Sequence, residues 1–378
     1  MLSRRKFIVG TALAAGALAG SSRPALASTN VVAGAIRWDA WNAGAGSLEQ
    51  GPVQAALGPA QFQTRAPWFA QRISPYAMSI DGNQQSIMDQ EITYAKNAGL
   101  NYWAYCWYGD TDLPMQKAWD LHQASAIKNQ VNWCMILQFS RMGNATKFNS
   151  LISTYVGYFQ QSNHQKVLGG RPLLYIFVDS STALAANWGN SWANVQSSLN
   201  ALRAACTNAG LATPYIVIMT GDPAAGQSIM TQVSADAISN YTAQLASGQP
   251  ATYAAQDTTA QAYWAALAAT GAPIIPICQT GWDTRPRKLR PPPWAPNPPG
   301  SGMLNYVAAG TPAQIAAHIQ AAITYIGANA AACPSKTLLI YSWNENDEGG
   351  SPLIPTWTPS SGPNTAILDA VAGVLNAA

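Results

Sequence analysis

Three acidic residues fall within four positions near the C-terminal end of the chain. Only four glutamates occur, at positions 49, 91, 345 and 348, and the last two belong to the segment Trp343-Asn344-Glu345-Asn346-Asp347-Glu348. Carboxyl groups this close cannot all ionise normally, so one holds its proton more tightly while another stays available as a base. Cleavage of a glycosidic bond needs that division between acid and base. We therefore predict Glu345 and Glu348 as catalytic residues.

A solvated acidic turn is the simpler interpretation of the same segment. Against it, the acids follow the apolar run 338–343, which is typical of a buried strand, in a chain where glutamate is rare. Acids beside a buried strand are more often functional than acids in an ordinary surface turn.

Aromatic, amide and acidic side chains also follow the other apolar runs. Aromatic faces stack on sugar rings, and carboxylates and amides hydrogen-bond to hydroxyl groups, so the collection suits a carbohydrate. We expect substrate contacts from Trp38, Asp39, Trp107, Tyr108, Asp110, Gln138, Asp179, Tyr241, Trp282, Asp283, Arg287, Trp343 and Asn344. The sequence has no Cys–His pair or GxSxG motif, and its three histidines lack metal-ligand spacing, so we expect no metal.

Eight short apolar runs alternate with helix-like stretches. The predicted strands are 32–38, 102–108, 132–138, 172–178, 215–220, 237–241, 274–279 and 337–343. The predicted helices include 86–98, 115–128, 145–160, 192–209, 260–269 and 312–327. This alternation indicates βα units around a parallel sheet. Eight such units, with neither a dinucleotide fingerprint nor a P-loop, favour an α/β fold of the (β/α)8 TIM-barrel type over an open sheet.

Two long loops follow predicted strands, on the C-terminal face where barrels carry their sites. Residues 39–85 are rich in Gly, Gln and Pro, and residues 280–310 contain the proline-rich run RPPPWAPNPPG. The second loop also holds Arg285, Arg287, Lys288 and Arg290. Either these basic side chains are solvated on the surface of the loop, or they bind acidic groups on a polysaccharide.

Side-chain alternation divides the aromatic residues of 102–108 into two sets. Trp103, Tyr105 and Trp107 face one way, and Tyr102 and Tyr108 face the other. Only residues at the upper end of a barrel strand reach a substrate. We therefore expect Trp107 and Tyr108 in the site, and Trp103 and Trp133 in the core.

Three segments together resemble glycoside hydrolase family 99 and the WbsX-like proteins grouped with it. They are the WNE-x-x-E pattern at 343–348, the AGLNYWAYCWYG segment at 98–109 and the TGWDTRPR segment at 280–287. The resemblance implies a (β/α)8 barrel that hydrolyses α-linked glycans, typically α-mannosides, in an endo fashion with retention and without a cofactor. It also implies site residues at Trp107, Tyr108, Trp282 and Asp283.

The same resemblance implies roles for the two glutamates. Glu345 would act as base on the 2-hydroxyl of the sugar, giving a 1,2-anhydro intermediate, and Glu348 would be the general acid and then the base that activates water. Departures from the family pattern occur beside them. Asn346 stands where the family has a second Trp, and the segment 349–355 lacks the third acid and is one residue longer. Substrate identity is therefore not carried over.

The N-terminal residues explain the net charge of +3. Residues 1–27 carry four basic groups and no acid, which leaves 16 basic against 17 acidic groups in the rest, so we expect neither nucleic acid nor a membrane surface as partner. The segment SRRKFI at 3–8, the apolar run 9–20 and ALA at 25–27 predict a twin-arginine signal peptide over residues 1–27. The apolar run is too short to span a bilayer, which takes about 20 residues. Residues 28–378 would then be one catalytic barrel, working in the periplasm or outside the cell.

Five cysteines occur, an odd number without CxxC spacing. Cys106, Cys134 and Cys278 lie in strand-like runs, and the spacing does not indicate whether Cys206 and Cys333 form a bridge.

The leading hypothesis is an exported glycoside hydrolase acting on an α-linked polysaccharide or oligosaccharide. The alternative is a carbohydrate-binding or surface-polysaccharide assembly protein on the same barrel. Two adjacent acids favour hydrolysis, because binding alone does not require them.

Overall fold

The computed structural model describes residues 30–42, 44, 47–108, 113–180, 182–243, 245, 249–360 and 362–378. The predicted signal peptide and Asp110 lie outside these ranges. The described strands are β1 (Val32–Arg37), β2 (Gln71–Ser74), β3 (Ala77–Ser79), β4 (Tyr102–Trp107), β5 (Asn132–Gln138), β6 (Lys166–Val167), β7 (Arg171–Phe177), β8 (Tyr215–Met219), β9 (Ala237–Ser239), β10 (Ile277–Gln279) and β11 (Thr337–Tyr341). The described α-helices are α1 (Gln50–Leu57), α2 (Ala60–Gln63), α3 (Gln85–Asn97), α4 (Leu113–Ala124), α5 (Ala145–Ser150), α6 (Ile152–Phe159), α7 (Ala183–Trp188), α8 (Trp192–Asn208), α9 (Pro223–Val233), α10 (Tyr253–Ala269), α11 (Arg285–Leu289), α12 (Pro312–Ala328) and α13 (Ala366–Leu375).

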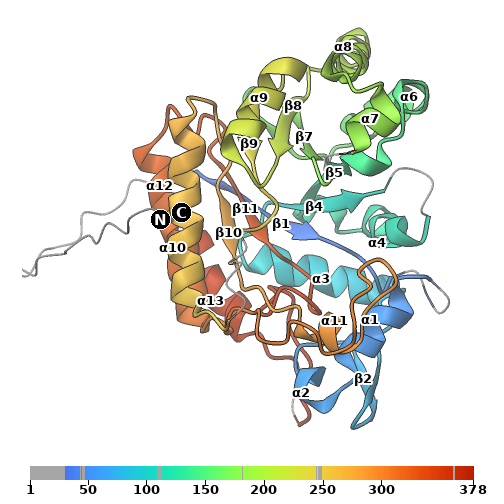
Figure 1. The fold of residues 1–378 in the computed structure, drawn as a ribbon, viewed down its shortest axis with the longest axis vertical. Coiled ribbons are helices and arrows are strands. Elements are labelled where there is room, and N and C mark those ends of the chain that lie inside the picture. Colours follow the sequence, from blue (N-terminus) through green and yellow to red (C-terminus); the bar gives the residue numbers. More distant parts are fainter. Residues whose placement is uncertain are drawn as a thin grey trace, which may run out of the picture.

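Eight parallel strands form a barrel with helices around it (Figure 1). Their order is β10, β11, β1, β4, β5, β7, β8, β9. The ring closes where Ile238 of β9 bridges Ile274, just before β10, through a 2.9 Å bond from Ile238 N to the Pro273 carbonyl and a 3.0 Å bond from Ile275 N to the Ile238 carbonyl. The predicted (β/α)8 barrel is confirmed.

The strand predictions are accurate except near proline and at the strand ends. β5 spans the predicted residues 132–138, whereas β10 begins only at Ile277 because Pro273 and Pro276 lack the N–H that a ladder needs. α10 begins at Tyr253, seven residues before the predicted start, where the Thr252 side chain accepts a hydrogen bond from Ala255 N. The predicted helix over 145–160 is two helices that meet at Leu151.

Side chains along each barrel strand point alternately into the barrel and out toward the helices, which gives two packed layers. Tyr102, Ala104 and Tyr341 point inward with the other residues of the barrel interior, whereas Trp103 and Trp107 point outward into the layer between strands and helices. Gly34 is required by the interior packing, because a Cβ there would lie 2.1 Å from the Tyr102 ring. The side of a strand that a residue occupies therefore decides whether it can reach the barrel mouth.

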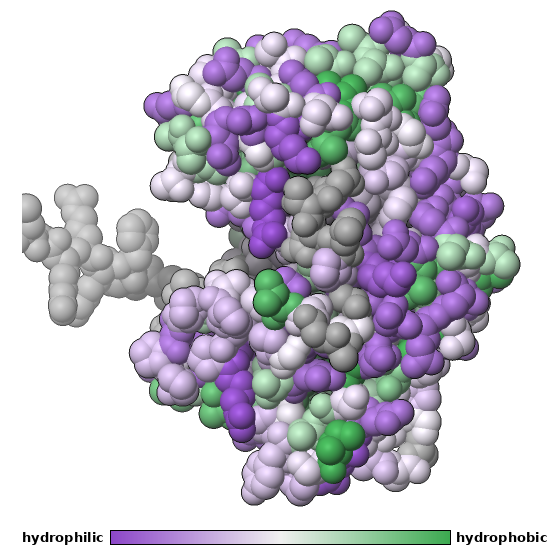
Figure 2. Space-filling view, turned by 90° about the vertical axis from the view of Figure 1, so that its right-hand side faces the viewer, coloured by the Kyte–Doolittle hydropathy of each residue, from purple (hydrophilic) through white to green (hydrophobic). Residues whose placement is uncertain are grey.

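The two long loops contain ordered structure. Residues 39–85 carry α1, α2 and the β2–β3 hairpin, and residues 280–310 carry α11. No helix among the described residues is long and apolar enough to cross a membrane. On the face drawn in Figure 2, hydrophobic residues of the described chain form small separate groups among polar ones.

Candidate active site

The turn after β11 carries both predicted catalytic glutamates. Glu345 N donates to Ser342 Oγ at 3.2 Å, and the N–H groups of Glu348 and Gly349 donate to the Glu345 carbonyl at 3.2 and 2.6 Å. The loop after β10 crosses this turn at Gly281, where φ is 140° and a Cβ would lie only 2.6 Å from the Gly349 carbonyl oxygen. Asp283 N also donates to the Glu348 carbonyl at 2.6 Å. The acid turn, residues 342–350, is therefore held tightly against the loop that follows β10.

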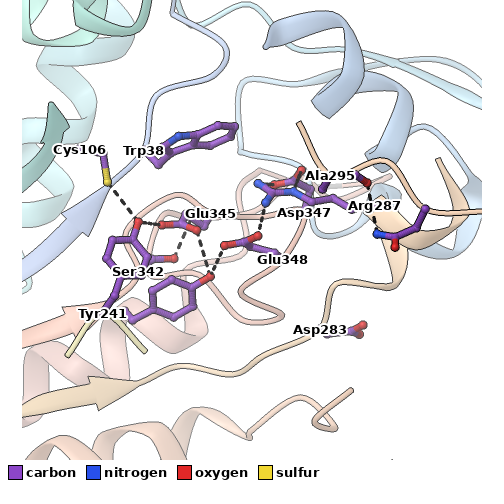
Figure 3. A network of polar contacts seen from close by, with 12 residues as sticks. Trp38, Cys106, Tyr241, Asp283, Arg287, Ala295, Ser342, Glu345, Asp347 and Glu348 are labelled. Atoms are coloured by element: carbon purple, nitrogen blue, oxygen red, sulfur yellow. Dashed lines mark hydrogen bonds and ion pairs between the residues drawn. The ribbon is translucent and has the colours of Figure 1, made fainter. Parts of the chain in front are cut away.

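The two glutamate side chains both contact the phenol of Tyr341. Figure 3 shows Glu345 and Glu348 next to each other, with Tyr241 beside Glu345 and Arg287 beside Glu348. Tyr341 Oη lies 3.0 Å from Glu345 Oε2 and 2.9 Å from Glu348 Oε1. Tyr241 donates its hydroxyl hydrogen to Glu345 Oε1, and Arg287 forms an ion pair with Glu348. Because Tyr341 has one hydroxyl hydrogen, it donates to one carboxylate and can only accept from the other. The geometry therefore fits a pair that shares a single acidic proton.

The surroundings push the pKa values of the two glutamates in opposite directions. Burial raises the pKa of Glu345 well above its usual value, and the charge of Glu348 adds to that shift. Burial also opposes ionisation of Glu348, but the Arg287 charge and hydrogen bonds to the carboxylate lower its pKa below the usual value. These opposite directions favour the proton on Glu345 and the negative charge on Glu348, whereas the family resemblance implies Glu348 as the general acid.

A cavity of about 310 Å³ opens beside this pair. Seven predicted site residues line it: Trp38, Tyr108, Gln138, Tyr241, Arg287, Glu345 and Glu348. A second cavity, of about 540 Å³, shares Phe177, Tyr241 and Glu348 with the first and adds the predicted residues Asp179 and Trp282. Polar and aromatic surface therefore extends to both sides of Glu348.

Five other predicted contact residues line neither of these two cavities, which corrects their expected placement: Asp39, Trp107, Asp283, Trp343 and Asn344. Trp107 is 2% exposed and packs against Trp119, Trp133 and Tyr158, because alternation along β4 turns it outward with Trp103. Trp103 and Trp133 are buried in the core, as expected. Trp343 is fully buried, and its indole N–H donates to Glu91 Oε2 at 3.1 Å.

Asp39 and Asn344 form a buried support beneath the acid turn. Arg37 pairs with Asp39 at 2.8 Å and also with Glu91. Asn344 donates to Asp39 Oδ1 at 2.8 Å and accepts from Trp38 N at 2.8 Å. Burial raises the pKa of Asp39 to about 6, although Arg37 opposes the shift. Asp39 and Asn344 therefore hold the end of β1 against the acid turn, and neither residue lines the cavity.

Asp283 is likewise a structural residue in this geometry. It pairs with Arg285 at 2.6 Å and with Arg65 at 3.1 Å. Arg65 comes from the first long loop and donates to the Asp283 carbonyl at 2.8 Å and the Asn346 carbonyl at 3.1 Å, while the Asn346 side chain donates to the Arg65 carbonyl at 2.6 Å. Arg65 thus joins three loops, and Asn346, which stands where the family has Trp, bonds to it through both backbone and side chain.

Three of the four basic side chains of the second loop bond to groups within the protein, and Arg290 is exposed. Arg287 binds Asp347 in a bidentate pair at 2.6 and 3.1 Å and also holds Glu348, and Arg285 stacks 3.5 Å from the Tyr306 ring centroid. Lys288 Nζ donates to the Gly302 carbonyl at 2.8 Å. Arg287 is therefore not a solvated side chain, because it pairs with Asp347 and Glu348 and lines the cavity. The alternative of a site for acidic sugars stays a prediction.

Sequence reasoning missed Tyr341 and several residues that line the first cavity. Tyr341, Cys106 and Phe177 follow the inward-facing set of their strands, so alternation could have found them. Trp294 lies in the proline-rich run and has no periodic signal. All five cysteines are free thiols, so Cys206 and Cys333 are not bridged. Within the described ranges, no group of three His, Cys, Asp or Glu side chains could hold a metal ion.

Neither family models nor curated protein sequences match this chain. Solved structures do. The endo-α-mannosidase of glycoside hydrolase family 99 from Bacteroides thetaiotaomicron, in complex with bis-tris-propane, superposes with a TM-score of 0.55 at 13% identity, covering 91% of this chain and 96% of that one. A second structure of that enzyme gives 0.50 at 14% identity, covering 82% and 84%.

A protein described as glycoside hydrolase-like superposes with a TM-score of 0.58 at 13% identity, covering 94% of this chain and 97% of that one. The fold is shared. The expected resemblance to the family 99 barrel is confirmed for the architecture over nearly the whole chain, and at these identities the likeness concerns the fold.

Proposed function

We propose that this chain is an exported glycoside hydrolase that cleaves α-linked bonds of a polysaccharide or oligosaccharide by carboxylate acid–base catalysis. The observation that carries the proposal is the pair Glu345 and Glu348, joined by one phenol and lining one cavity with Trp38 and Tyr108. A buried acid pair of unequal pKa beside an aromatic wall is the arrangement that this chemistry needs. The printed names of the structural neighbours, an endo-α-mannosidase and a glycoside hydrolase-like protein, support the same reaction class.

The Tyr341 hydroxyl offers a route for the proton before the reaction. Glu345 passes its proton to Tyr341 Oη while Tyr341 passes its own hydrogen to Glu348, so one proton moves and the phenol is unchanged. Glu348 then becomes the acid and Glu345 the base. Arg287 stays paired through Asp347 when Glu348 is neutral.

The retaining route then follows with atoms and charges balanced. Glu345 takes the 2-hydroxyl proton, the 2-oxygen bonds to the anomeric carbon, and the departing oxygen takes the Glu348 proton, which gives the 1,2-anhydro sugar. Glu348 next removes a proton from water, the water oxygen opens the three-membered ring, and the 2-oxygen recovers its proton from Glu345. General acid–base help of this kind contributes roughly 10²–10⁴-fold per group.

A screen of the mature protein against α-linked and β-linked glycans tests the reaction class. We expect new reducing ends from an α-linked substrate such as α-mannan, and none from β-linked glucans of equal length. Proton NMR of the first product formed should show the α anomer, as retention requires. A wild-type protein that binds glycans tightly and releases no reducing ends would instead support the binding or assembly function.

A further inference from the structure

A proline strap, defined as residues 290–299, presents an indole at the mouth of the catalytic cavity. Six of its ten residues are proline, which restricts the backbone before any ligand binds. Hydrogen bonds fix the strap at both ends: Arg290 N donates to the Pro286 carbonyl at 2.9 Å, and Gly300 N to the Lys288 carbonyl at 2.7 Å. Trp294 lies at its centre and remains 41% exposed.

The Trp294 ring continues an aromatic wall that ends at the acid pair. Its centroid lies 5.8 Å from that of Trp38 at an interplanar angle of 60°. The Trp38 indole N–H donates to Tyr108 Oη, and the Arg287 guanidinium lies 5.1 Å from the Trp38 ring centroid. Figure 3 shows Trp38 beside Arg287, Glu345 and Glu348. All of these side chains line the same cavity, so a ring that contacts Trp294 can belong to a ligand that reaches the glutamates.

The charges around the cavity favour an uncharged ligand. With the proton on Glu345, the carboxylates of Glu49 and Glu348 in the cavity lining, and that of Asp347 next to Arg287, face two guanidinium groups, those of Arg141 and Arg287. Arg287 already balances Asp347 and Glu348. A uronate would add a further negative charge to a partly desolvated site that has no cation to spare at Arg287, which is unfavourable.

We propose that Trp294 and Trp38 form a stacking subsite for an uncharged pyranose ring of the glycan. The inference rests on the proposed function for its ligand class, and it adds a residue and a charge preference that the acid pair does not determine. An exposed indole covered by a sugar ring removes apolar surface from water on both partners. The rigid strap lowers the ordering cost of that contact.

Calorimetric binding in the Glu348→Gln background, where turnover does not interfere, tests the subsite. The probes are an α-mannan tetrasaccharide and an α-galacturonan tetrasaccharide. Trp294→Ala should weaken mannan binding roughly tenfold, while Trp294→Phe should retain most of it. The matched control is Leu304→Ala, which removes another exposed apolar side chain of the same loop outside the cavity. Circular dichroism of each variant reports its folding.

Unchanged mannan affinity in folded Trp294→Ala, binding of neither probe, or preference for the galacturonan would overturn the subsite. Failure of the proposed function gives a different pattern. A wild-type protein that binds mannan through Trp294 but releases no reducing ends would refute hydrolysis and leave the subsite standing.

Discussion

Tyr341 joins two carboxyl groups with one hydroxyl hydrogen, and this makes it the residue that sets the proton count of the site. Its hydrogen bond is one of the contacts that lower the pKa of Glu348. Tyr341→Phe should therefore raise the pKa of Glu348 and move the acidic limb of the kcat/KM profile to higher pH. We expect kcat to fall about 10²-fold, the usual cost of one lost donor at a reacting centre, with KM little changed.

The matched control for Tyr341 is Tyr175→Phe. Tyr175 is another fully buried, inward-facing phenol, but it bonds to Tyr102 Oη at 2.9 Å instead of to a carboxylate. Both variants lose one buried hydroxyl, so a merely structural effect would be similar in the two. An unshifted pH profile in Tyr341→Phe would remove the phenol from the account.

Arg287 stabilises two acidic groups, and its loss has a pH-dependent cost. The pKa of Glu348 is depressed in the folded protein, so its ionised form contributes stability above the unfolded pKa, and that stability is lost as pH falls through the folded value. Arg287→Gln should lower the free energy of unfolding by about 3–5 kcal/mol near neutral pH, because it leaves buried charge unpaired. The deficit should shrink as the pH approaches about 4, where glutamate takes up a proton.

Urea unfolding at several pH values measures this dependence. Arg285→Gln is the control, because its guanidinium is 31% exposed and its partner Asp283 keeps Arg65. We expect a loss of no more than about 1 kcal/mol there. Equal losses at both arginines, or a deficit in Arg287→Gln that grows toward acid, would contradict the charge assignment.

Sequence reasoning placed side chains correctly in the fold where spacing and strand pattern agreed, and misplaced them where strand orientation decided. The acid pair could be found because two rare glutamates follow a buried strand. Trp107 lies at the end of β4, which favours a place in the site, but its side chain points outward on the same side of the strand as Trp103. The direction of the side chain decides its position. The ion pairs of Arg287 and Asp283 needed three-dimensional structure, because their partners come from other loops.

At the scale of elements, the first long loop acts as a brace for the acid turn. Its composition gave no periodic signal, so α1, α2 and the β2–β3 hairpin were not predicted, whereas the barrel strands were visible as apolar runs. Arg65 of this loop reaches the carbonyls of Asp283 and Asn346. The brace therefore connects the loops that follow β1, β10 and β11.

Removal of the brace should destabilise the protein. Arg65→Ala loses two charge-assisted hydrogen bonds and one ion pair, so we expect a loss of about 2–4 kcal/mol in the free energy of unfolding. Thermal and urea denaturation would measure it, with Arg72→Ala, an exposed arginine of β2, as the control. If Arg65→Ala is as stable as Arg72→Ala, the acid turn does not depend on the first loop.

At the scale of the whole molecule, the barrel brings eight strand ends to one face. The eight-fold alternation of apolar runs with helix patterns was enough to predict this architecture, and closure at the Ile238–Ile274 bridge completes it. Pro273 and Pro276 shorten β10, so within the described residues only one β-bridge, between Ile238 and Ile274, joins this part of the ring to β9. The pattern of apolar residues does not show this. The site draws on loops far apart in sequence because the closed barrel makes their ends neighbours.

The export prediction also concerns the whole chain. Replacing Arg4 and Arg5 by lysine should leave the precursor in the cytoplasm, because the twin-arginine route requires both guanidinium groups. Arg23→Lys makes the same charge-conserving substitution outside the motif and should be exported normally. Immunoblots of cytoplasmic and periplasmic fractions and of the medium would read the outcome, and normal export of the twin-lysine variant would refute this route.

The most direct test of the account is the rate of reducing-end release by wild-type protein, Glu345→Gln and Glu348→Gln on one α-linked substrate. Each amide keeps the size of the side chain but cannot exchange the proton that the cycle needs. We predict a loss of at least about 10³-fold in each variant, with folding and glycan binding retained. Wild-type turnover in either folded variant would contradict the claim that these two carboxyl groups perform the reaction.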